Sequence, residues 1–508
     1  MGSFTNSLTI GTTQLTSTGE TDGYLAKYLP NGTLAWVRQI GSTGREQAAA
    51  VAVDAAGNAY VTGYFGNSIT LGNNLSLSGA PAGTPAQDRL FVVRYSPQGT
   101  PEWTQQAKVV TMSTFSNGIY SSGTSIGIDA QGTVHVAGVL NLSVAIGTLS
   151  ITPPASTREL GTFLARFAGA TGAVQSLTPV FFYAANNTSG AYSPQVAVGA
   201  GGEAYLLNFF NQGVVLANST TLTSRGSTDA LITKYGPDGA FAWAQQIGGT
   251  GEDRTHDAAV DAAGNLYVTG YLEGSATFGD ATTVTGAGNW DGYLAKYSSL
   301  GALQWVQTGG GTGFDQWNGL GLDAAGNPYV AGNFAGTARF GSATLTSAGN
   351  LDIAVVAYSP TGQVRWVQQA GGPSTDSARH LALDGQGNVY VNGIFSGTAA
   401  FGALSLTTAA SPPSETFLAR LGNAPLATSA ARSRALGFYP NPATDQLHLP
   451  ALPAGTRVQL IDGLGRVARA TSVSAAAQVS VQGLTPGLYT LRATDAKGQQ
   501  LTGKVVVE

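Results

Sequence analysis

Two series of acidic residues recur along the chain at positions where carboxylates could hold calcium or take part in acid–base chemistry. One series contains Asp22, Asp88, Asp229, Asp291 and Asp352, and the other contains Glu46, Asp253, Asp315 and Asp376. Calcium needs several oxygen ligands that converge on one point. Each series supplies one acid per repeated unit, so the simpler interpretation is that each carboxylate caps backbone N–H groups in a recurring turn. We therefore predict no cofactor and no metal site, with loop-bound calcium as the alternative.

The other reactive residues form no catalytic arrangement. The chain has 4 histidines and no cysteine, so thiolate chemistry is excluded, and no His-x-x-x-His pair suggests a zinc hydrolase. Residues 123–127 (GTSIG) match a nucleophile elbow and residues 309–313 (GGGTG) resemble a phosphate loop, but no helix is expected after either. We predict no catalytic residue.

The composition is typical of many short strands joined by tight turns. Charged residues make up 10% of the 508 residues, glycine is abundant at 70, and the net charge is -4. Scattered charges of this kind give no basic surface for nucleic acid. No apolar run approaches the roughly 20 residues of a transmembrane segment, so none is predicted.

These residues are placed by a repeated unit whose clearest copy is DAAGNLYVTG at residues 261–270, with further copies at residues 54–63, 323–332 and 384–393. The Asp and Gly suit a tight turn between two strands, which we name A and B. A strand C such as residues 291–297 follows, then a Pro-x-Gly turn, and then a strand D marked by a tryptophan: Trp36, Trp103, Trp243, Trp305 and Trp366. Four antiparallel strands repeated radially predict a β-propeller, with a solenoid as the alternative.

The strand count indicates seven blades, with six as the alternative. Strand C recurs seven times, whereas A and D each recur six times, because the first unit has no A and the last has Ser429 where the tryptophan should stand. Residues 2–11 match residues 63–72 in register, so we expect that the chain is truncated at its N-terminus, and that an upstream segment supplies a signal peptide and the strands that close the ring. The units, over about residues 1–421, resemble the bacterial seven-bladed β-propeller repeat family, which is structural and extracellular by association and does not imply a catalytic reaction.

The amino-acid composition changes after the propeller repeats (residues 1–422). An Ala/Ser/Pro-rich linker, residues 423–435, leads into residues 436–508, where short alternating strands predict a small immunoglobulin-like β-sandwich. Four segments there resemble the type A sorting domain of type IX secretion. The matching residues are Tyr439, Pro440, Asn441, Pro442, Asp462, Gly465, Gly487, Tyr489 and Lys504.

The second resemblance implies a localisation and partners. The protein is expected to be extracellular or on the outer surface of a Gram-negative bacterium, after passage through the type IX secretion machinery. The resemblance also implies removal of the sorting domain and attachment of the mature protein to surface lipopolysaccharide.

Loop lengths suggest which face of the ring binds a ligand. The D–A connection spans 18 residues from Trp36 to Asp54, but 26 from Trp103 to Asp129 and 24 from Gln175 to Gly199. Exposed aromatic and amide side chains suit stacking and hydrogen bonding to sugars, although long loops also pack their own aromatics. The predicted ligand-binding residues are Phe115, Tyr120, Phe181, Phe182, Tyr183, Asn187, Tyr192, Asp315 and Trp317.

The sequence thus favours a binding or adhesion module for glycan or protein. The alternative is an extracellular polysaccharide-active hydrolase or lyase that uses carboxylates on the loop face. Such an enzyme would need two acids held ~5–10 Å apart across a cleft.

Overall fold

The computed structural model describes residues 1–29, 32–79, 88–109, 121–185, 193–279, 282–408, 414–421, 434–462, 467–494 and 500–508. These residues form strands and turns and divide into two compact units, Met1–Asn423 and Ala424–Glu508. No helix among the described residues is long and apolar enough to cross a membrane.

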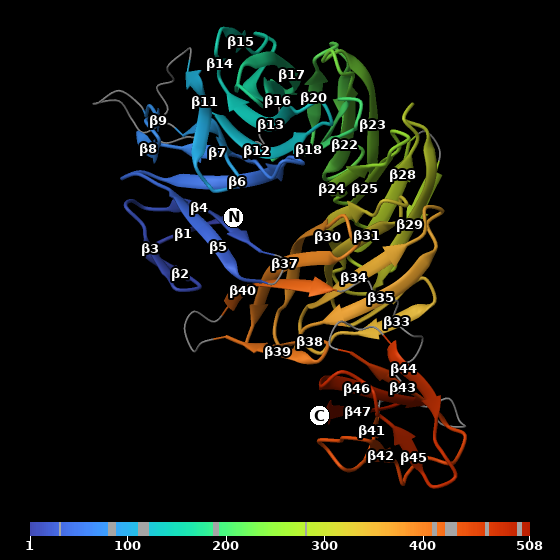
Figure 1. Ribbon diagram of the computed structural model, residues 1–508. Helices are drawn as coiled ribbons and strands as arrows, with labels where there is room; N and C mark the ends of the chain where they lie inside the picture. The colour runs from blue at the N-terminus through green and yellow to red at the C-terminus, as the bar shows by residue number, and fades with distance from the viewer. Residues whose placement is uncertain are drawn as a thin grey trace. The chain divides into compact units, whose positions relative to one another are not determined.

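The first unit is a ring of sheets, which confirms the β-propeller (Figure 1). In the described residues, seven sheets follow one another in chain order, and we call them blades 1 to 7. Blade 1 contains β1 (Gly2–Phe4), β4 (Asp22–Tyr28) and β5 (Leu34–Ile40). Blade 2 contains β6 (Glu46–Val53), β7 (Ala59–Phe65), β10 (Arg89–Tyr95) and β11 (Pro101–Val109). Blade 3 contains β12 (Ser121–Ile128), β13 (Thr133–Asn141), β16 (Thr157–Ala168) and β17 (Val174–Ala184).

The later blades repeat this order of strands A, B, C and D. Blade 4 contains β18 (Gln195–Val198), β19 (Ala204–Phe210), β22 (Asp229–Tyr235) and β23 (Phe241–Gly249). Blade 5 contains β24 (Arg254–Val260), β25 (Leu266–Leu272), β28 (Asp291–Tyr297) and β29 (Leu303–Gly311). Blade 6 contains β30 (Gln316–Leu322), β31 (Pro328–Phe334), β34 (Asp352–Tyr358) and β35 (Val364–Ala370). Blade 7 contains β36 (Ser377–Leu383), β37 (Val389–Ser396) and β40 (Ser414–Leu421).

The repeated A–B turn is held by its aspartate, as the sequence predicts. In blade 5, Oδ1 of Asp261 accepts hydrogen bonds from the backbone N–H groups of Ala263 (3.0 Å) and Asn265 (2.9 Å). Gly264 has a φ of 77°, a left-handed conformation that favours glycine. Partial burial opposes ionisation of Asp261, but the side-chain amide of Asn265, which donates to Oδ2 (2.9 Å), together with these backbone bonds lowers the pKa of Asp261 below its usual value.

Four D-strand tryptophans, Trp36, Trp103, Trp243 and Trp305, link their blade to the next one. The indole N–H of Trp103 donates to the carbonyl of Gly169 (2.8 Å), and that of Trp243 donates to the carbonyl of Ser299 (3.2 Å). Each acceptor lies in the C–D turn of the following blade. The indole also packs on the strand-B tyrosine of its own blade, with 5.8 Å between the ring centroids of Tyr205 and Trp243. The tryptophan of strand D therefore stabilises the contact between neighbouring blades.

No secondary structure was predicted for the long B–C connection. In the structure it forms a β-hairpin that lies against the D strand of the preceding blade. The hairpins are β2 (Ser7–Ile10) with β3 (Thr13–Thr16), β8 (Ile69–Gly72) with β9 (Leu75–Leu77), β14 (Val144–Ile146) with β15 (Leu149–Ile151), β20 (Gly213–Leu216) with β21 (Thr221–Thr223), β26 (Ser275–Phe278) with β27 (Thr282–Thr285), β32 (Thr337–Phe340) with β33 (Ala343–Thr346), and β38 (Thr398–Phe401) with β39 (Leu404–Thr407). In blade 5, β26 pairs with β23, the D strand of blade 4. The same pairing joins β14 to β11, β20 to β17 and β32 to β29. A hairpin in this position protects an outer strand edge that would otherwise be unpaired.

The second unit is a small sandwich of two sheets, as expected. One sheet has the order β41-β47-β46-β43-β44 and the other pairs β42 with β45. The strands are β41 (Arg434–Ala435), β42 (Gln446–His448), β43 (Arg457–Ile461), β44 (Val467–Ser472), β45 (Gln478–Ser480), β46 (Gly487–Thr494) and β47 (Gln500–Val507). Their shared core includes Leu447, Val479, Leu460, Leu491 and Val505.

Candidate functional site

Several predicted ligand residues lie outside the described part of the chain. Phe115 and Tyr120 fall in residues 110–120, and Asn187 and Tyr192 fall in residues 186–192. Their role stays a prediction.

Three other predicted residues belong to a strand and not to a binding loop. Phe181, Phe182 and Tyr183 extend β17, where they pair with β20. Their exposed fractions are 0%, 4% and 0%, and Phe181 packs edge-on against Tyr183 with 5.3 Å between centroids. The expectation of exposed aromatics was wrong here, because the D strand is longer than expected and the next blade's hairpin covers it.

Asp315 and Trp317 are also buried. Trp317 is 1% exposed and packs against Phe340 at 5.4 Å between centroids. Oδ2 of Asp315 accepts the N–H of Gly311 (2.7 Å), and its Oδ1 accepts the N–H of Ala335 (3.1 Å). These side chains support the loop but are not available to a ligand.

The D–A loop between blades 5 and 6 nevertheless carries an exposed aromatic group that the sequence analysis missed. Trp290, which directly precedes β28, stacks on Tyr271 from β25, with 4.3 Å between centroids and 18° between planes. Phe314, in the D–A loop, packs edge-on against Trp290 at 5.1 Å and is 48% exposed. Trp290 is half-buried, and Tyr271, only 3% exposed, lies beneath it. We call Tyr271, Trp290 and Phe314 the aromatic platform.

Polar groups surround this platform. His256 packs edge-on against Tyr271 at 5.3 Å between centroids, and its Nδ1–H donates to the carbonyl of Trp317 (3.0 Å). Burial lowers the pKa of His256, so the ring is neutral near pH 7 and its Nε2 can accept a hydrogen bond. Nearby, Arg254 forms an ion pair with Glu252 and lies 4.4 Å from the ring centroid of Phe209. Aromatic faces beside such donors and acceptors suit a polar ligand that has apolar faces.

The scaffold does not require aromatic residues at this junction. Trp290 and Phe314 form a parallel bridge between neighbouring blades, and the equivalent bridges join Thr21 to Arg45, Thr228 to Glu252, and Leu351 to Thr375. Smaller or polar residues therefore satisfy the same backbone geometry elsewhere in the ring. This contrast is the signal that could have found the platform from the sequence.

The same bridges bring the two acidic series together. Each bridge residue directly precedes an acid, so Asp22 lies beside Glu46, Asp229 beside Asp253, Asp291 beside Asp315, and Asp352 beside Asp376. The carboxylates do not stand one per blade, as the sequence suggested, but two per junction. Asp88 is an exception, since β10 begins at Arg89, which occupies the position of Asp291 in blade 5.

These acids are buried and capped by the backbone. Burial is the largest influence on Asp253 and raises its pKa to about 7, with neighbouring Asp229 adding a smaller effect. Burial is also the largest influence on Asp315 and raises its pKa to about 6. Among the described residues, no three His, Asp or Glu side chains are placed to share a metal ion.

The second unit places the predicted sorting residues around β47. Nδ2 of Asn441 donates to the carbonyl of Lys504 (3.0 Å), and its Oδ1 accepts the N–H of Val506 (2.8 Å). Tyr439 is 58% exposed and stacks on His448, with 5.3 Å between centroids. Tyr489 is buried and its hydroxyl donates to the carbonyl of Thr485 (2.8 Å).

The remaining sorting residues give less information. Pro440 and Pro442 flank Asn441, Asp462 follows β43, and Gly487 opens β46. Gly465 lies in residues 463–466, outside the described part.

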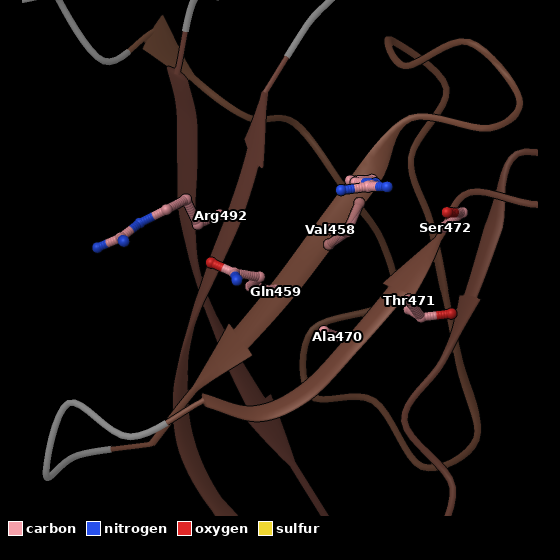
Figure 2. A pocket seen from close by; sticks show the side chains of 7 residues that line it. Val458, Gln459, Ala470, Thr471, Ser472 and Arg492 are labelled. Atoms are coloured by element: carbon pink, nitrogen blue, oxygen red, sulfur yellow. The ribbon is translucent and has the colours of Figure 1, made fainter.

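A shallow pocket of about 470 Å³ lies on the β43–β44 hairpin of this unit (Figure 2). Its lining residues are Arg457, Val458, Gln459, Ala470, Thr471, Ser472 and Arg492. Arg492 comes from the neighbouring β46 (Figure 2). The two arginines make its rim basic.

Comparison with known families matches both units. Residues 437–508 match the family described as secretion system C-terminal sorting domain. Residues 35–64 and 365–393 match the family described as β-propeller repeat.

Similarity to individual proteins is distant. The chain is 23% identical over 362 residues to an uncharacterized WD repeat-containing protein of Acanthamoeba polyphaga mimivirus, and the match takes in 62% of this chain but only 26% of that relative. Among solved structures, a puromycin hydrolase mutant aligns with 12% identity and a TM-score of 0.35, over 90% of this chain and 58% of that one. The extracellular domain of a putative hybrid two-component system from B. thetaiotaomicron aligns with 10% identity and a TM-score of 0.19, over 95% of this chain and 77% of that one.

The seven sheets and the sandwich define the class: an all-β, multi-bladed propeller followed by an immunoglobulin-like domain. The chain is a bacterial β-propeller repeat protein that ends in a type IX secretion sorting domain. The sorting domain makes it a secreted or cell-surface protein and a client of the secretion machinery.

Proposed function

We propose that the protein is a non-catalytic binding module at the cell surface, and that its aromatic platform binds glycan. The observation that supports this most strongly is the stack of Trp290 on Tyr271 with Phe314 at its edge, 48% exposed. Sugar rings have apolar C–H faces that stack on aromatic rings, while their hydroxyls need donors and acceptors around the stack. His256 and the ion pair of Arg254 with Glu252 supply such groups.

The geometry gives less support to a polysaccharide hydrolase or lyase. A glycosidase needs one acid and one base that both reach the scissile bond. The paired acids at the blade junctions are instead buried, and Asp315 and Asp253 each accept two backbone N–H groups. Their role in the fold is thereby accounted for.

The ring itself provides the variant that tests the platform. Replacing Trp290 with Leu and Phe314 with Thr reproduces the Leu351–Thr375 junction, which the same scaffold already tolerates. We expect the double variant to fold and to lose at least about ten-fold in affinity for cell-surface polysaccharide, since stacking on one ring contributes on the order of 1 kcal/mol. The assay is a glycan array followed by calorimetry.

A matched control is Leu300→Thr, because Leu300 is 87% exposed in the C–D turn on the opposite face. Glycan binding that persists in the Trp290/Phe314 variant and is lost in the Leu300 variant would refute the site. Binding only to a protein ligand, lost in the platform variant, would keep the platform but change the ligand class.

A further inference from the structure

A second aromatic ring lies one blade before the aromatic platform. Phe209 of β19 pairs with Ala230, and Tyr271 of β25 pairs with Gly292, so the two rings occupy the same strand position in blades 4 and 5. Phe209 is half-buried. Blades 4 and 5 are the only consecutive blades with an aromatic ring at this position in the part of the chain that the structure describes. The equivalent residues of the other blades are Ser3, Tyr64, Val139, Asn333 and Ile394.

Arg254 connects Phe209 to the strand that carries Tyr271. Arg254 begins β24, which lies beside β22 of blade 4 (Figure 1), and it pairs with Tyr271 across the sheet of blade 5. Its guanidinium carbon lies 4.4 Å from the ring centroid of Phe209. A planar guanidinium on an aromatic ring offers a ligand a flat face and hydrogen-bond donors together. The flat surface of the platform is thereby continued toward blade 4.

These contacts form a series that extends over three blades: Phe209, Arg254, Tyr271, Trp290 and Phe314. Trp290 stacks on Tyr271 with 4.3 Å between centroids, and Phe314 packs against Trp290 at 5.1 Å. Trp290 precedes strand C of blade 5 and Arg254 belongs to its strand A, so two strand spacings, about 10 Å, separate these positions. Phe209 lies farther away, in blade 4. A single sugar ring is too short to reach from Trp290 to Phe209, whereas a chain of about three rings spans that length.

The scaffold does not require this series. In blade 5 the paired residues of strands A and B are Arg254 and Tyr271. In blade 6 the Nε2 of Gln316 donates to Oδ1 of Asn333 (3.4 Å) at the same place. Polar or small side chains therefore satisfy the same backbone pairing elsewhere in the ring. The equivalent pairs are Gln47 with Tyr64, Gln316 with Asn333, and Ser377 with Ile394.

The charges around the series favour an uncharged ligand. The charged groups that act on Tyr271 are Arg254, Glu252 and Glu273. Arg254 forms an ion pair with Glu252, and the N–H of Glu252 donates to Oε2 of the exposed Glu273 (2.9 Å). Two carboxylates beside one guanidinium give a net negative charge, which repels an anionic chain. Carboxylate oxygens also accept hydrogen bonds from sugar hydroxyls.

We propose that this surface binds a neutral oligosaccharide lengthwise, with the aromatic platform as one subsite and Phe209 with Arg254 as a second subsite. The inference rests on the proposed function, because the platform supplies the first subsite. It adds the length of the bound chain, its course across blades 4 to 6, and its lack of charge.

The first test measures how affinity depends on chain length and charge. The probes are linear glucan, xylan and mannan oligosaccharides of one to four residues, titrated into the full chain by calorimetry. For the sugar type that binds, we expect the tetrasaccharide to bind at least ten-fold more tightly than the disaccharide, because only the longer chain reaches both subsites. A galacturonic acid tetrasaccharide, which is anionic, should bind at least ten-fold more weakly than the neutral tetrasaccharide.

The second test removes the second subsite with residues that the ring already holds at equivalent positions. Phe209→Ile with Arg254→Gln introduces the residue types of Ile394 and Gln316. The double variant should bind the tetrasaccharide at least ten-fold more weakly and change disaccharide affinity less than two-fold. Arg254→Gln alone should weaken tetrasaccharide binding at least three-fold, which provides a test if the double variant does not fold. The matched control is Tyr64→Ile, the same strand position in blade 2, which should leave every affinity unchanged.

The outcomes separate this inference from the proposed function. Equal affinity for the disaccharide and the tetrasaccharide, or unchanged tetrasaccharide binding in both Arg254 variants, would overturn the second subsite. If the Trp290/Phe314 variant then still loses binding, the platform itself is retained. Tighter binding of the galacturonic acid chain would overturn the uncharged ligand class. Glycan binding that survives in the Trp290/Phe314 variant, or no binding of any probe to the unmodified chain, would overturn both proposals.

Discussion

Asp291 and Asp315 come from neighbouring blades, and their carboxylates converge on Gly310. A Cβ atom at Gly310 would lie 2.3 Å from Oδ1 of Asp291 and 2.9 Å from Oδ2 of Asp315, so only glycine fits between them. The backbone N–H of Asp315 donates to the carbonyl of Trp290 (2.9 Å), which sets the two strands side by side. The same backbone bond joins Glu46 to Thr21, Asp253 to Thr228, and Asp376 to Leu351. Each of these junctions holds a pair of acidic side chains with limited access to solvent.

The buried acids should make the ring more stable as the pH falls from 8 to about 6.5. Burial raises the pKa of Asp253 and of Asp257 from 3.8 to about 7. The folded state therefore takes up protons in this range and the unfolded state does not, so the free energy of unfolding should rise by on the order of 1 kcal/mol. Urea unfolding of the full chain across this range measures the slope.

The control for this pH dependence is Asp253→Asn, which removes one titrating group and should reduce the slope. The histidines His135, His256 and His380, whose pKa values are lowered, oppose the trend mainly below pH 6.5, because there the unfolded state gains their protons. A free energy of unfolding that decreases between pH 8 and 6.5 would contradict the interpretation.

The inter-blade hydrogen bond of Trp243 should contribute measurably to stability. Trp243→Phe keeps an aromatic ring near Tyr205 but removes the donor to the carbonyl of Ser299, and we expect a loss of about 1 kcal/mol. Trp243→Ala also leaves a cavity and should cost about 3–5 kcal/mol. Chemical denaturation compares the two variants, and equal losses would show that the indole N–H contributes nothing beyond packing.

Gly301 offers an independent check of the same contact. It has a φ of 86°, and a Cβ atom there would lie 2.9 Å from the indole of Trp243. Gly301→Ala should therefore destabilise the ring, whereas Gly385→Ala, with no atom within 4 Å of its Cβ position, should be close to neutral. A neutral Gly301 variant would argue against tight packing at this turn.

In the sorting domain, Asn441 should be needed for surface display. It joins the segment around Tyr439 to β47 through two hydrogen bonds, to Lys504 and Val506. Asn441→Ala removes both and should lower the stability of this unit by about 1–2 kcal/mol. Surface labelling of whole cells should then show less displayed protein. A variant that lacks residues 436–508 serves as the reference for complete loss of display.

The matched control is Asn441→Asp, which retains an acceptor for the N–H of Val506 and loses only the donor. It should be intermediate in both stability and display. Undiminished display of the deletion variant, in cells with a working secretion system, would contradict the role of the domain.

Much of the fold was predictable because it is encoded over short distances in the sequence. The Asp261 turn and the strand from Asp291 to Tyr297 each depend on neighbours within one blade, and the tryptophan of strand D is recognised by its recurrence at a fixed distance after strand C. Their recurrence identified the propeller, and the segments around Asn441 and Tyr489 identified the sorting domain. The prediction that Phe181 and Tyr183 are exposed was wrong because both are buried. The sequence of a long connection does not show whether an aromatic residue faces solvent or a hairpin from the next blade.

The sequence by itself determined the type of blade, the number of strands C and the C-terminal sorting domain, since turn chemistry and strand periodicity are local properties. Only the tertiary structure decided what meets across blades. The stack of Trp290 on Tyr271, the pairing of Asp291 with Asp315, and the contact of Arg254 with Phe209 all depend on how one sheet packs on the next. No local pattern specifies these neighbours, because they are set by the closure of the ring as a whole.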